Sequence, residues 1–198
     1  MLAFSRMGLS LPRVAMKHLS DSAAGTPRLP IIGHMDTRWK PNVTVAAIIE
    51  RDGRYLLVEE ETLEGLRLNN PAGHLDPAES PAQACAREAL EETTHLFTPT
   101  HLVGVYLSRF QRERTGEDIT YLRLAFAGEL GEVQPGRQLD SGILRTVWMT
   151  PDEVRASQER HRSPLVLRCI EDHLAGQRHA LDLIYTDAAV CGLGPLLP

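Results

Sequence analysis

Short apolar runs separated by turn residues make up much of the chain. Residues 43–49 and 55–58 are rich in Val, Ile, Leu and Ala, and Asp52-Gly53 lies between them. Because Asp-Gly accepts the positive φ angles of a tight turn, these two runs predict a β-hairpin. Further strand-like runs lie at residues 101–108, 121–127 and 143–149.

Three helices are predicted from their start signals. Residues 80–83 read Ser-Pro-Ala-Gln and residues 150–153 read Thr-Pro-Asp-Glu, which is the spacing of a capping box with proline in the first turn. Ser163-Pro164 indicates a third helix, which Gly176 can end. Strands, one helix, more strands and then helices predict a single α+β domain with a mixed sheet.

The first 34 residues differ from the rest. They carry four Lys and Arg residues against one acid, whereas the whole chain has a formal net charge of −5. Their apolar residues follow no helical or strand period. We expect residues 1–34 to be a disordered extension or to precede a natural start at Met35; a transit peptide is the alternative. The folded domain is predicted to comprise residues 35–198.

Composition excludes several classes of function. With 42% hydrophobic and 24% charged residues, the chain has the balance of a soluble globular protein. Acids and bases are spread along it, which does not favour a nucleic-acid partner. No apolar run approaches the roughly 18 residues that span a bilayer, and the N-terminus lacks a secretory signal.

The cysteines support the same picture. Cys85, Cys169 and Cys191 show no paired metal-site spacing, so we interpret them as reduced packing residues. We therefore expect a cytoplasmic monomer or homodimer with no membrane or nucleic-acid partner.

A cluster of acids follows the predicted helix start at Ser80. Glu88, Glu91 and Glu92 would project from one side of a helix, with Cβ atoms about 5–6 Å apart. Three like charges repel one another, so a cation should share their site. Mg²⁺ fits, because it takes carboxylate oxygens and completes its shell with water and substrate phosphates. The alternative is a solvated helix face whose acids pair with Arg87 or other bases.

These acids belong to a longer pattern. Its parts are Gly73, Glu79, Arg87-Glu88 and Glu91-Glu92, with five, seven and two residues between successive parts. The pattern resembles the signature box of the Nudix hydrolases. This resemblance implies a Nudix-type α/β/α sandwich and metal-dependent cleavage of diphosphate bonds, with Arg87, Glu88, Glu91 and Glu92 catalytic and the three glutamates as metal ligands.

The match is incomplete at its end. The family usually has Gly and then an aliphatic residue where this chain has Thr94 and His95. Because a β-branched residue is strained in the left-handed conformation, we expect the helix to continue past Thr94 or to end with a different turn.

Three further segments narrow the resemblance. Residues 40–46, 70–75 and 162–166 are similar in sequence and order to those of NudJ-type phosphatases, a bacterial subgroup of the family. That subgroup implies release of phosphate or diphosphate from nucleoside di- and triphosphates or from thiamine-pathway pyrophosphates, with Mg²⁺ or Mn²⁺. The alternatives are a hydrolase of ADP-ribose or dinucleoside polyphosphates and, in another class, a non-catalytic Nudix-fold domain that binds a nucleotide.

Residues outside the box are candidates for substrate binding. Gly73 lets the chain pass close to the metal site, and Arg109, Arg123 and Arg162 are candidates for binding phosphate through their guanidinium groups. The alternative for each arginine is an ordinary surface position.

Two further roles have several candidates. The base that takes a proton from water has candidates in Glu113, Glu117 and Asp118, for which a polar hairpin tip is the alternative. Tyr106, Phe110 and Tyr121 are candidates for stacking on a base or pyrimidine ring, with packing in the sheet as the alternative.

Overall fold

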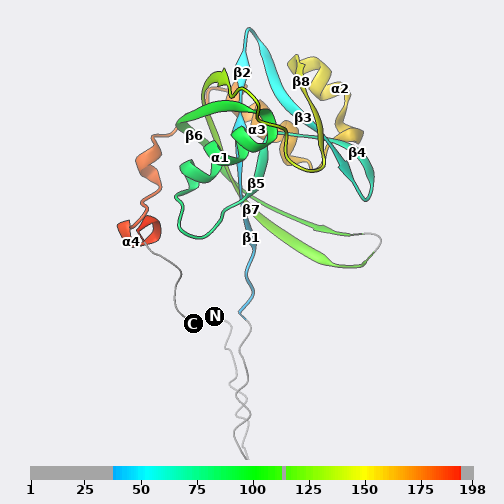
Figure 1. Cartoon of the computed structure of the whole chain (residues 1–198). Helices are drawn as coiled ribbons and strands as arrows, with labels where there is room; N and C mark the ends of the chain where they lie inside the picture. The colour runs from blue at the N-terminus through cyan, green and yellow to red at the C-terminus, as the bar shows by residue number, and fades with distance from the viewer. Residues whose placement is uncertain (1–37, 113–114, 193–198) are drawn as a thin grey trace, which may run out of the picture. The chain divides into compact units, whose positions relative to one another are not determined.

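The computed structural model describes residues 38–112 and 115–192 (Figure 1). The predictions for residues 1–34 and the candidate base Glu113 lie outside the described residues. The strands are β1 (Asn42–Ile48), β2 (Glu50–Arg51), β3 (Arg54–Thr62), β4 (Gly65–Asn69), β5 (Ala72–His74), β6 (His95–Gln111), β7 (Asp118–Val133) and β8 (Ile143–Met149).

The strands form two sheets. In the first, the order is β5-β1-β7-β6, with β1 and β7 parallel and the other pairs antiparallel. In the second, β2, β4 and β8 all pair antiparallel with β3. The predicted mixed sheet is therefore confirmed. So is the predicted tight turn, in which Asp52 and Gly53 have φ angles of 51° and 72°.

The predicted helices form, and two of them start as the capping boxes indicate. They are α1 (Pro81–Thr93), α2 (Pro151–Ala156) and α3 (Leu165–Leu174). The short α4 (Ala188–Cys191) and 3₁₀ turns at Gln158–Arg160 and Leu181–Leu183 were not predicted. Reciprocal capping bonds join Ser80 to Gln83 and Thr150 to Glu153. Among the described helices, none is long and apolar enough to cross a membrane.

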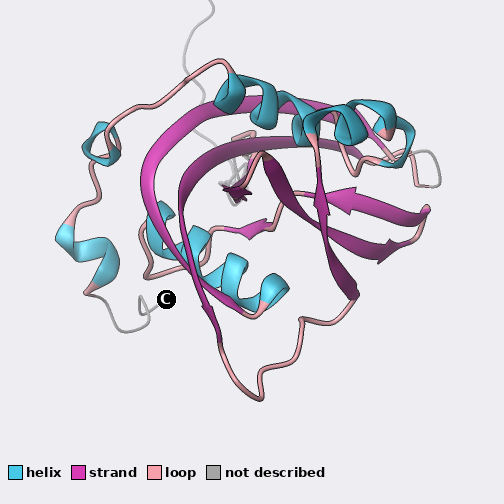
Figure 2. Ribbon diagram, turned by 90° about the horizontal axis from the view of Figure 1, so that it is seen from above, coloured by secondary structure: helices cyan, strands magenta, loops and turns pink. Residues whose placement is uncertain are grey.

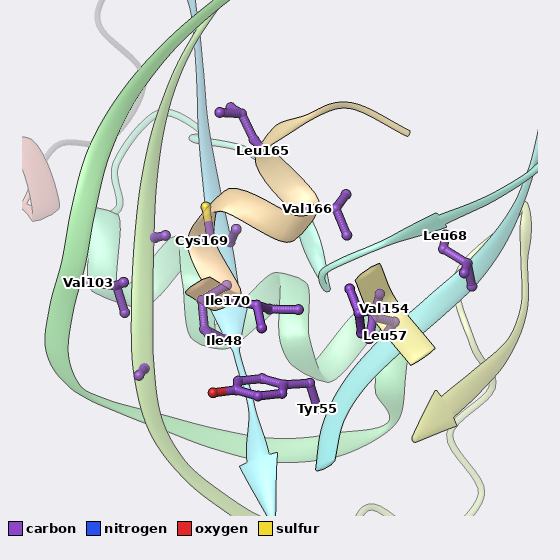
Figure 3. Close-up of a cluster of buried hydrophobic side chains, with 13 residues drawn as sticks. Ile48, Tyr55, Leu57, Leu68, Val103, Val154, Leu165, Val166, Cys169 and Ile170 are labelled. Atoms are coloured by element: carbon purple, nitrogen blue, oxygen red, sulfur yellow. The ribbon is translucent and has the colours of Figure 1, made fainter. Parts of the chain in front are cut away.

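Side chains of β1 point alternately into two cores, as expected for a strand buried on both faces. Ala46 and Ile48 pack with α3 in the cluster that Figure 3 shows. Val45 and Ala47 pack with α1 on the opposite face, and Figure 2 shows helices on both sides of the strands. This is the predicted α/β/α sandwich. Each fully buried Val, Leu or Ile contributes about 1.5–3 kcal/mol to its stability.

The cysteines divide between core and surface. Cys85 and Cys169 are free and buried, as predicted, one in each core. Cys191 is exposed, so its interpretation as a packing residue was wrong.

The prediction for the end of α1 was also wrong. Thr94 adopts the left-handed conformation with φ 62° and ψ 2°, and its N–H donates to the Leu90 carbonyl. The chain must turn at once into β6, whose first residue is His95. Contacts on both sides of the turn hold it, since the Thr93 hydroxyl bonds the Ala89 carbonyl and the Gln134 N–H bonds the Thr94 carbonyl. These bonds offset a strain of about 1–2 kcal/mol for a non-glycine residue.

Candidate active site

Helix α1 lies against the short edge strand β5, and its sequence allows a close approach. Ala84, Cys85 and Ala89 form its buried stripe, and these small side chains bring the backbone near the sheet. Glu92 follows on the same stripe at helical spacing and is only 8% exposed. The box carboxylates are therefore held at the boundary between helix and sheet.

Gly73 of β5 is required by this contact. A Cβ atom added to Gly73 would overlap the carboxylate of Glu88. The sequence suggested that glycine allows the chain to pass close to the acids, and the structure shows which acid it passes.

Arg87 organises the outer part of the cluster. Its guanidinium bonds both oxygens of Glu79, at 3.0 and 2.8 Å, Glu88 Oε1 at 2.8 Å and Glu91 Oε2 at 3.0 Å. It also donates to the His74 carbonyl of β5 at 3.0 Å. The Glu79 hydrogen bonds are the main cause of a raised Arg87 pKa, so this arginine is a permanent cation among the acids.

The pKa values of Glu79 and Glu88 shift in opposite directions. Burial raises the pKa of Glu79, but its bonds to Arg87 and to the Asp76 N–H outweigh burial, so the net shift is downward. For Glu88, burial outweighs Arg87, and the pKa is raised.

Glu92 differs from the other box acids in its hydrogen-bond partner. Its Oε2 accepts the Ala72 N–H at 2.8 Å, and no salt bridge to it occurs among the described residues. Burial raises the pKa of Glu92 to about 8, with further contributions from Glu88 and Glu60. A cation in contact with this carboxylate would reverse that shift.

The donor set suits a hard divalent ion. Glu88, Glu91 and Glu92 each use one oxygen in the contacts above, which leaves the second carboxylate oxygen for a metal. In the described residues, no three His, Cys, Asp or Glu side chains already converge as a metal site. Arg87 Nη1 donates to one oxygen of Glu88 and one oxygen of Glu91, so it holds these two carboxylates beside each other.

A cavity of about 150 Å³ lies on the other side of β5. Ala72, Gly73 and His74 form one wall, and Arg162, Ser163 and Leu165 at the start of α3 form another. The backbone of β5 thus contacts the carboxylate cluster on α1 and also lines the cavity. A ligand in the cavity would have one end next to the box glutamates.

The inner end of the cavity is polar. Thr44, Glu60, Asn69 and Arg123 line it, and Arg123 pairs in register with Thr44 between β7 and β1. Arg123 is 8% exposed, and burial lowers the pKa of its guanidinium. Within the described part of the chain, its Nε and Nη1 atoms have no hydrogen-bond partner. A buried arginine with two such donors can bind an oxygen or nitrogen of a ligand.

The structure brings some predicted residues to this cavity. Arg123 and Arg162 line it, as do Phe110 and Tyr121. Tyr106 instead donates to Asp172 at 3.0 Å and packs against the α3 core.

Other predicted residues lie at the β6–β7 hairpin, where each forms an ion pair with another hairpin residue. Arg109 Nε bonds Asp118 Oδ1 at 2.8 Å, and Arg112 pairs with Glu117 at 3.1 Å. Neither Arg109, Glu117 nor Asp118 lines the cavity next to the carboxylates. The placement matches the polar hairpin tip that the sequence offered as the alternative for the two acids.

Three of the four polar residues at the inner end of the cavity were not predicted. Thr44 and Glu60 lie in strands, and Asn69 is the last residue of β4. The available signal was a polar residue in an apolar strand for Thr44 and a run of three glutamates for Glu60. It did not show which face the residue occupied, since the bulge between Glu59 and Glu60 shifts the register of β3.

The α/β/α sandwich and the carboxylate helix define the class of this protein. Residues 39–169 match the family described as the NUDIX domain. The chain therefore belongs to this family and is a Nudix hydrolase, whose members generally use divalent metal ions.

Named relatives and solved structures support the same family assignment. Phosphatase NudJ of Escherichia coli strain K12 is 37% identical over 147 residues, which cover 74% of this chain and 92% of that protein. The solved structure of a Nudix hydrolase from Nitrosomonas europaea is 51% identical, with a TM-score of 0.68 and coverage of 75% and 98%. A UDP-X diphosphatase at 19% identity and a TM-score of 0.56, covering 76% of this chain and 70% of that one, shares the fold.

Proposed function

We propose that this Nudix hydrolase is Mg²⁺-dependent and releases phosphate or diphosphate from nucleoside di- and triphosphates or from a thiamine-pathway pyrophosphate. The main supporting observation is that one strand, β5, contacts the box carboxylates and also lines a polar cavity. A small phosphorylated metabolite fits this arrangement. The 37% identity to Phosphatase NudJ supports the choice of reaction.

In this proposal, Glu88, Glu91 and Glu92 hold the metal, with Mn²⁺ as a substitute for Mg²⁺. The bound ion supplies neutralisation of phosphate charge and a lower pKa for attacking water. Arg87 keeps Glu79 in place through two hydrogen bonds and ties α1 to the His74 carbonyl. These bonds fix the distance between the carboxylates and the cavity wall.

The environment of Glu92 also supports a change in its protonation state when a cation binds. Its raised pKa keeps the carboxyl largely protonated at neutral pH until a cation binds. The Ala72 N–H orients it toward β5. A cation held by Glu92 would therefore displace the proton of this carboxyl to solvent.

A metabolite screen tests the proposal. The full-length protein is assayed with Mg²⁺ and with EDTA against nucleoside di- and triphosphates, thiamine-pathway pyrophosphates, ADP-ribose and dinucleoside polyphosphates. Released phosphate and diphosphate are read separately. We expect Mg²⁺-dependent release from the first two groups. Preference for ADP-ribose or dinucleoside polyphosphates would refute the substrate assignment, and equal rates in EDTA would refute the metal requirement.

A further inference from the structure

Glu59 of β3, the chain neighbour of the cavity residue Glu60, is a buried acid with two arginine partners. Its side chain is only 7% exposed. Its Oε2 accepts a hydrogen bond from Arg145 Nε at 2.7 Å, and its Oε1 accepts one from Arg160 Nη2. These bonds, that from Arg145 first, hold the pKa of Glu59 below its ordinary value. Glu59 is therefore an ionised carboxylate shared by two arginines.

The two arginines belong to different parts of the structure. Arg145 of β8 lies directly opposite Glu59 in the strand register, so this contact is an ordinary cross-strand pair. Arg160 is the last residue of the 3₁₀ turn Gln158–Arg160, two residues before Arg162. Arg162 and Ser163 line the cavity, whereas neither Arg145 nor Arg160 does. Glu59 is therefore linked to the cavity wall through Arg160 and not through Arg145.

The 3₁₀ turn has few other contacts that would hold it. None of its three residues is buried, and the hydrogen bonds of a single 3₁₀ turn have poorer geometry than those of an α-helix. Backbone contacts with β4 begin only after the turn, where His161 forms a bridge with Leu68 and the Arg162 N–H donates to the Leu68 carbonyl at 2.8 Å. Because its carboxylate is buried, the Glu59–Arg160 pair also differs from an exposed ion pair, which contributes little.

We propose that Glu59 and Arg160 are a positioning pair for substrate binding. They hold the turn before α3 against β3, and this keeps Arg162 and Ser163 in place along the cavity. The inference rests on the proposed function, in which the cavity receives part of the substrate. If Arg160 is removed, Glu59 keeps Arg145 as its partner, so its buried charge stays compensated while the cavity wall loses a contact. The two arginines therefore allow a positioning role to be separated from a general effect on stability.

Two matched variants of the full-length protein compare these arginines. Arg160→Met and Arg145→Met each remove one hydrogen bond to Glu59 and keep a long, unbranched side chain. The parameters kcat and KM are measured with saturating Mg²⁺ on whichever of ATP, GTP, CTP and UTP wild type hydrolyses fastest. We expect Arg160→Met to raise KM about tenfold with kcat within about twofold, because a displaced wall weakens binding of substrate and transition state alike. Arg145→Met should keep KM within about twofold of wild type.

Thermal melts of the same variants distinguish positioning from stability. The hydrogen bond from Arg145 is the main cause of the lowered Glu59 pKa, so Arg145→Met should lower the melting temperature at least as much as Arg160→Met. If the pair only stabilised the fold, KM would change equally in both variants. Equal KM values in Arg160→Met and Arg145→Met would therefore overturn the proposal.

A conservative variant tests whether the charge of Arg160 is what matters. Arg160→Lys keeps a cationic donor for Glu59 Oε1, and this contact is a single hydrogen bond. We expect Arg160→Lys to restore KM to within about threefold of wild type. A KM as high as that of Arg160→Met would contradict the role of the ion pair.

Hydrogen exchange without substrate separates this proposal from the proposed function. Exchange of backbone amides in residues 159–166 is followed by mass spectrometry on each full-length variant in EDTA. The Arg162 N–H is bonded to the Leu68 carbonyl, and its exchange reports local opening of the turn. We expect exchange in this segment to be about tenfold faster in Arg160→Met and unchanged in Arg145→Met. Equal exchange in both variants would overturn the positioning role, whereas absence of Mg²⁺-dependent turnover in wild type would refute the proposed function and leave this measurement readable.

Discussion

Two groups of charged residues that the sequence offered for one active site differ in what surrounds them. On α1, Glu92 is 8% exposed and has a backbone N–H as its partner. On the β6–β7 hairpin, Arg109 and Asp118 have side chains 73% and 48% exposed and pair with each other. The hairpin charges cost little because water and their partners solvate them. The charge of Glu92 costs much, as its raised pKa shows.

This difference in burial and pairing favours a functional role for the α1 acids and a local structural role for the hairpin charges. A protein retains an under-compensated buried acid at the expense of stability, and such groups concentrate at functional sites. Exposed ion pairs carry no such information. The comparison therefore favours the proposal that the chemistry lies on α1, and Arg109, Glu117 and Asp118 stay predictions. The predictions below test this assignment from the largest expected effect to the smallest.

The largest effect is expected from Glu88→Gln. Removing the charge but not the size of this acid should lower turnover by several orders of magnitude, because the metal loses a charged ligand. Glu117→Gln on the hairpin is the matched control and should keep near-normal turnover. Steady-state rates with saturating Mg²⁺ check both variants. A large loss in Glu117→Gln with none in Glu88→Gln would reverse the comparison.

Gly73→Ala should have the next largest effect. The new methyl group overlaps the Glu88 carboxylate, so either the acid or β5 must move. We expect turnover to fall roughly a hundredfold, the size of effect that a displacement of about 1 Å can produce. Kinetics and a thermal melt measure the outcome. Normal turnover would show that Glu88 does not need its present position.

In the metal-free protein, ionisation of the buried Glu92 should lower the free energy of unfolding. Its folded pKa of about 8 lies above the ordinary value of 4.5, so the neutral acid favours folding below pH 4.5, and this contribution is lost as pH rises toward 8. Between pH 5 and 8 in EDTA, wild type should lose roughly 2–4 kcal/mol relative to Glu92→Gln. Urea unfolding at both pH values measures this gap. A gap that does not change with pH would contradict the raised pKa.

The smallest effect is expected at the hairpin. Arg109→Ala and Asp118→Asn break one exposed ion pair. We expect melting temperatures within about 2 °C of wild type and turnover within about twofold. Thermal melts and steady-state rates of each variant measure both effects. A tenfold loss of turnover in either would restore the hairpin as part of the site.

Most of the fold was predictable because local signals agree with long-range packing. Ser80 and Gln83 form their capping box, and residues 143–149 form β8 with the predicted bounds. The exit of α1 was not predictable in this way. The propensity of Thr94 argued against the left-handed turn, but the bond from the Gln134 N–H to its carbonyl comes from a distant strand end.

The site was predictable to a different degree in its two halves. The box residues Gly73, Glu79 and Glu88 are close in sequence, so one helix and one loop bring them together. The cavity combines Glu60 of β3 with Arg123 of β7 and Arg162 before α3. Its residues meet only after both sheets form, and each one looks like an ordinary strand or loop residue in the sequence.

The most direct test of the central claim is Mg²⁺ binding measured by calorimetry at pH 7 in buffers of different ionisation enthalpy. Because Glu92 is largely protonated before the metal binds and a ligating carboxylate must be ionised, wild type should bind Mg²⁺ with release of close to one proton. Glu92→Gln should bind more weakly and release almost none, while Glu117→Gln should match wild type. Equal affinity and equal proton release in wild type and Glu92→Gln would contradict a metal site on the α1 carboxylates.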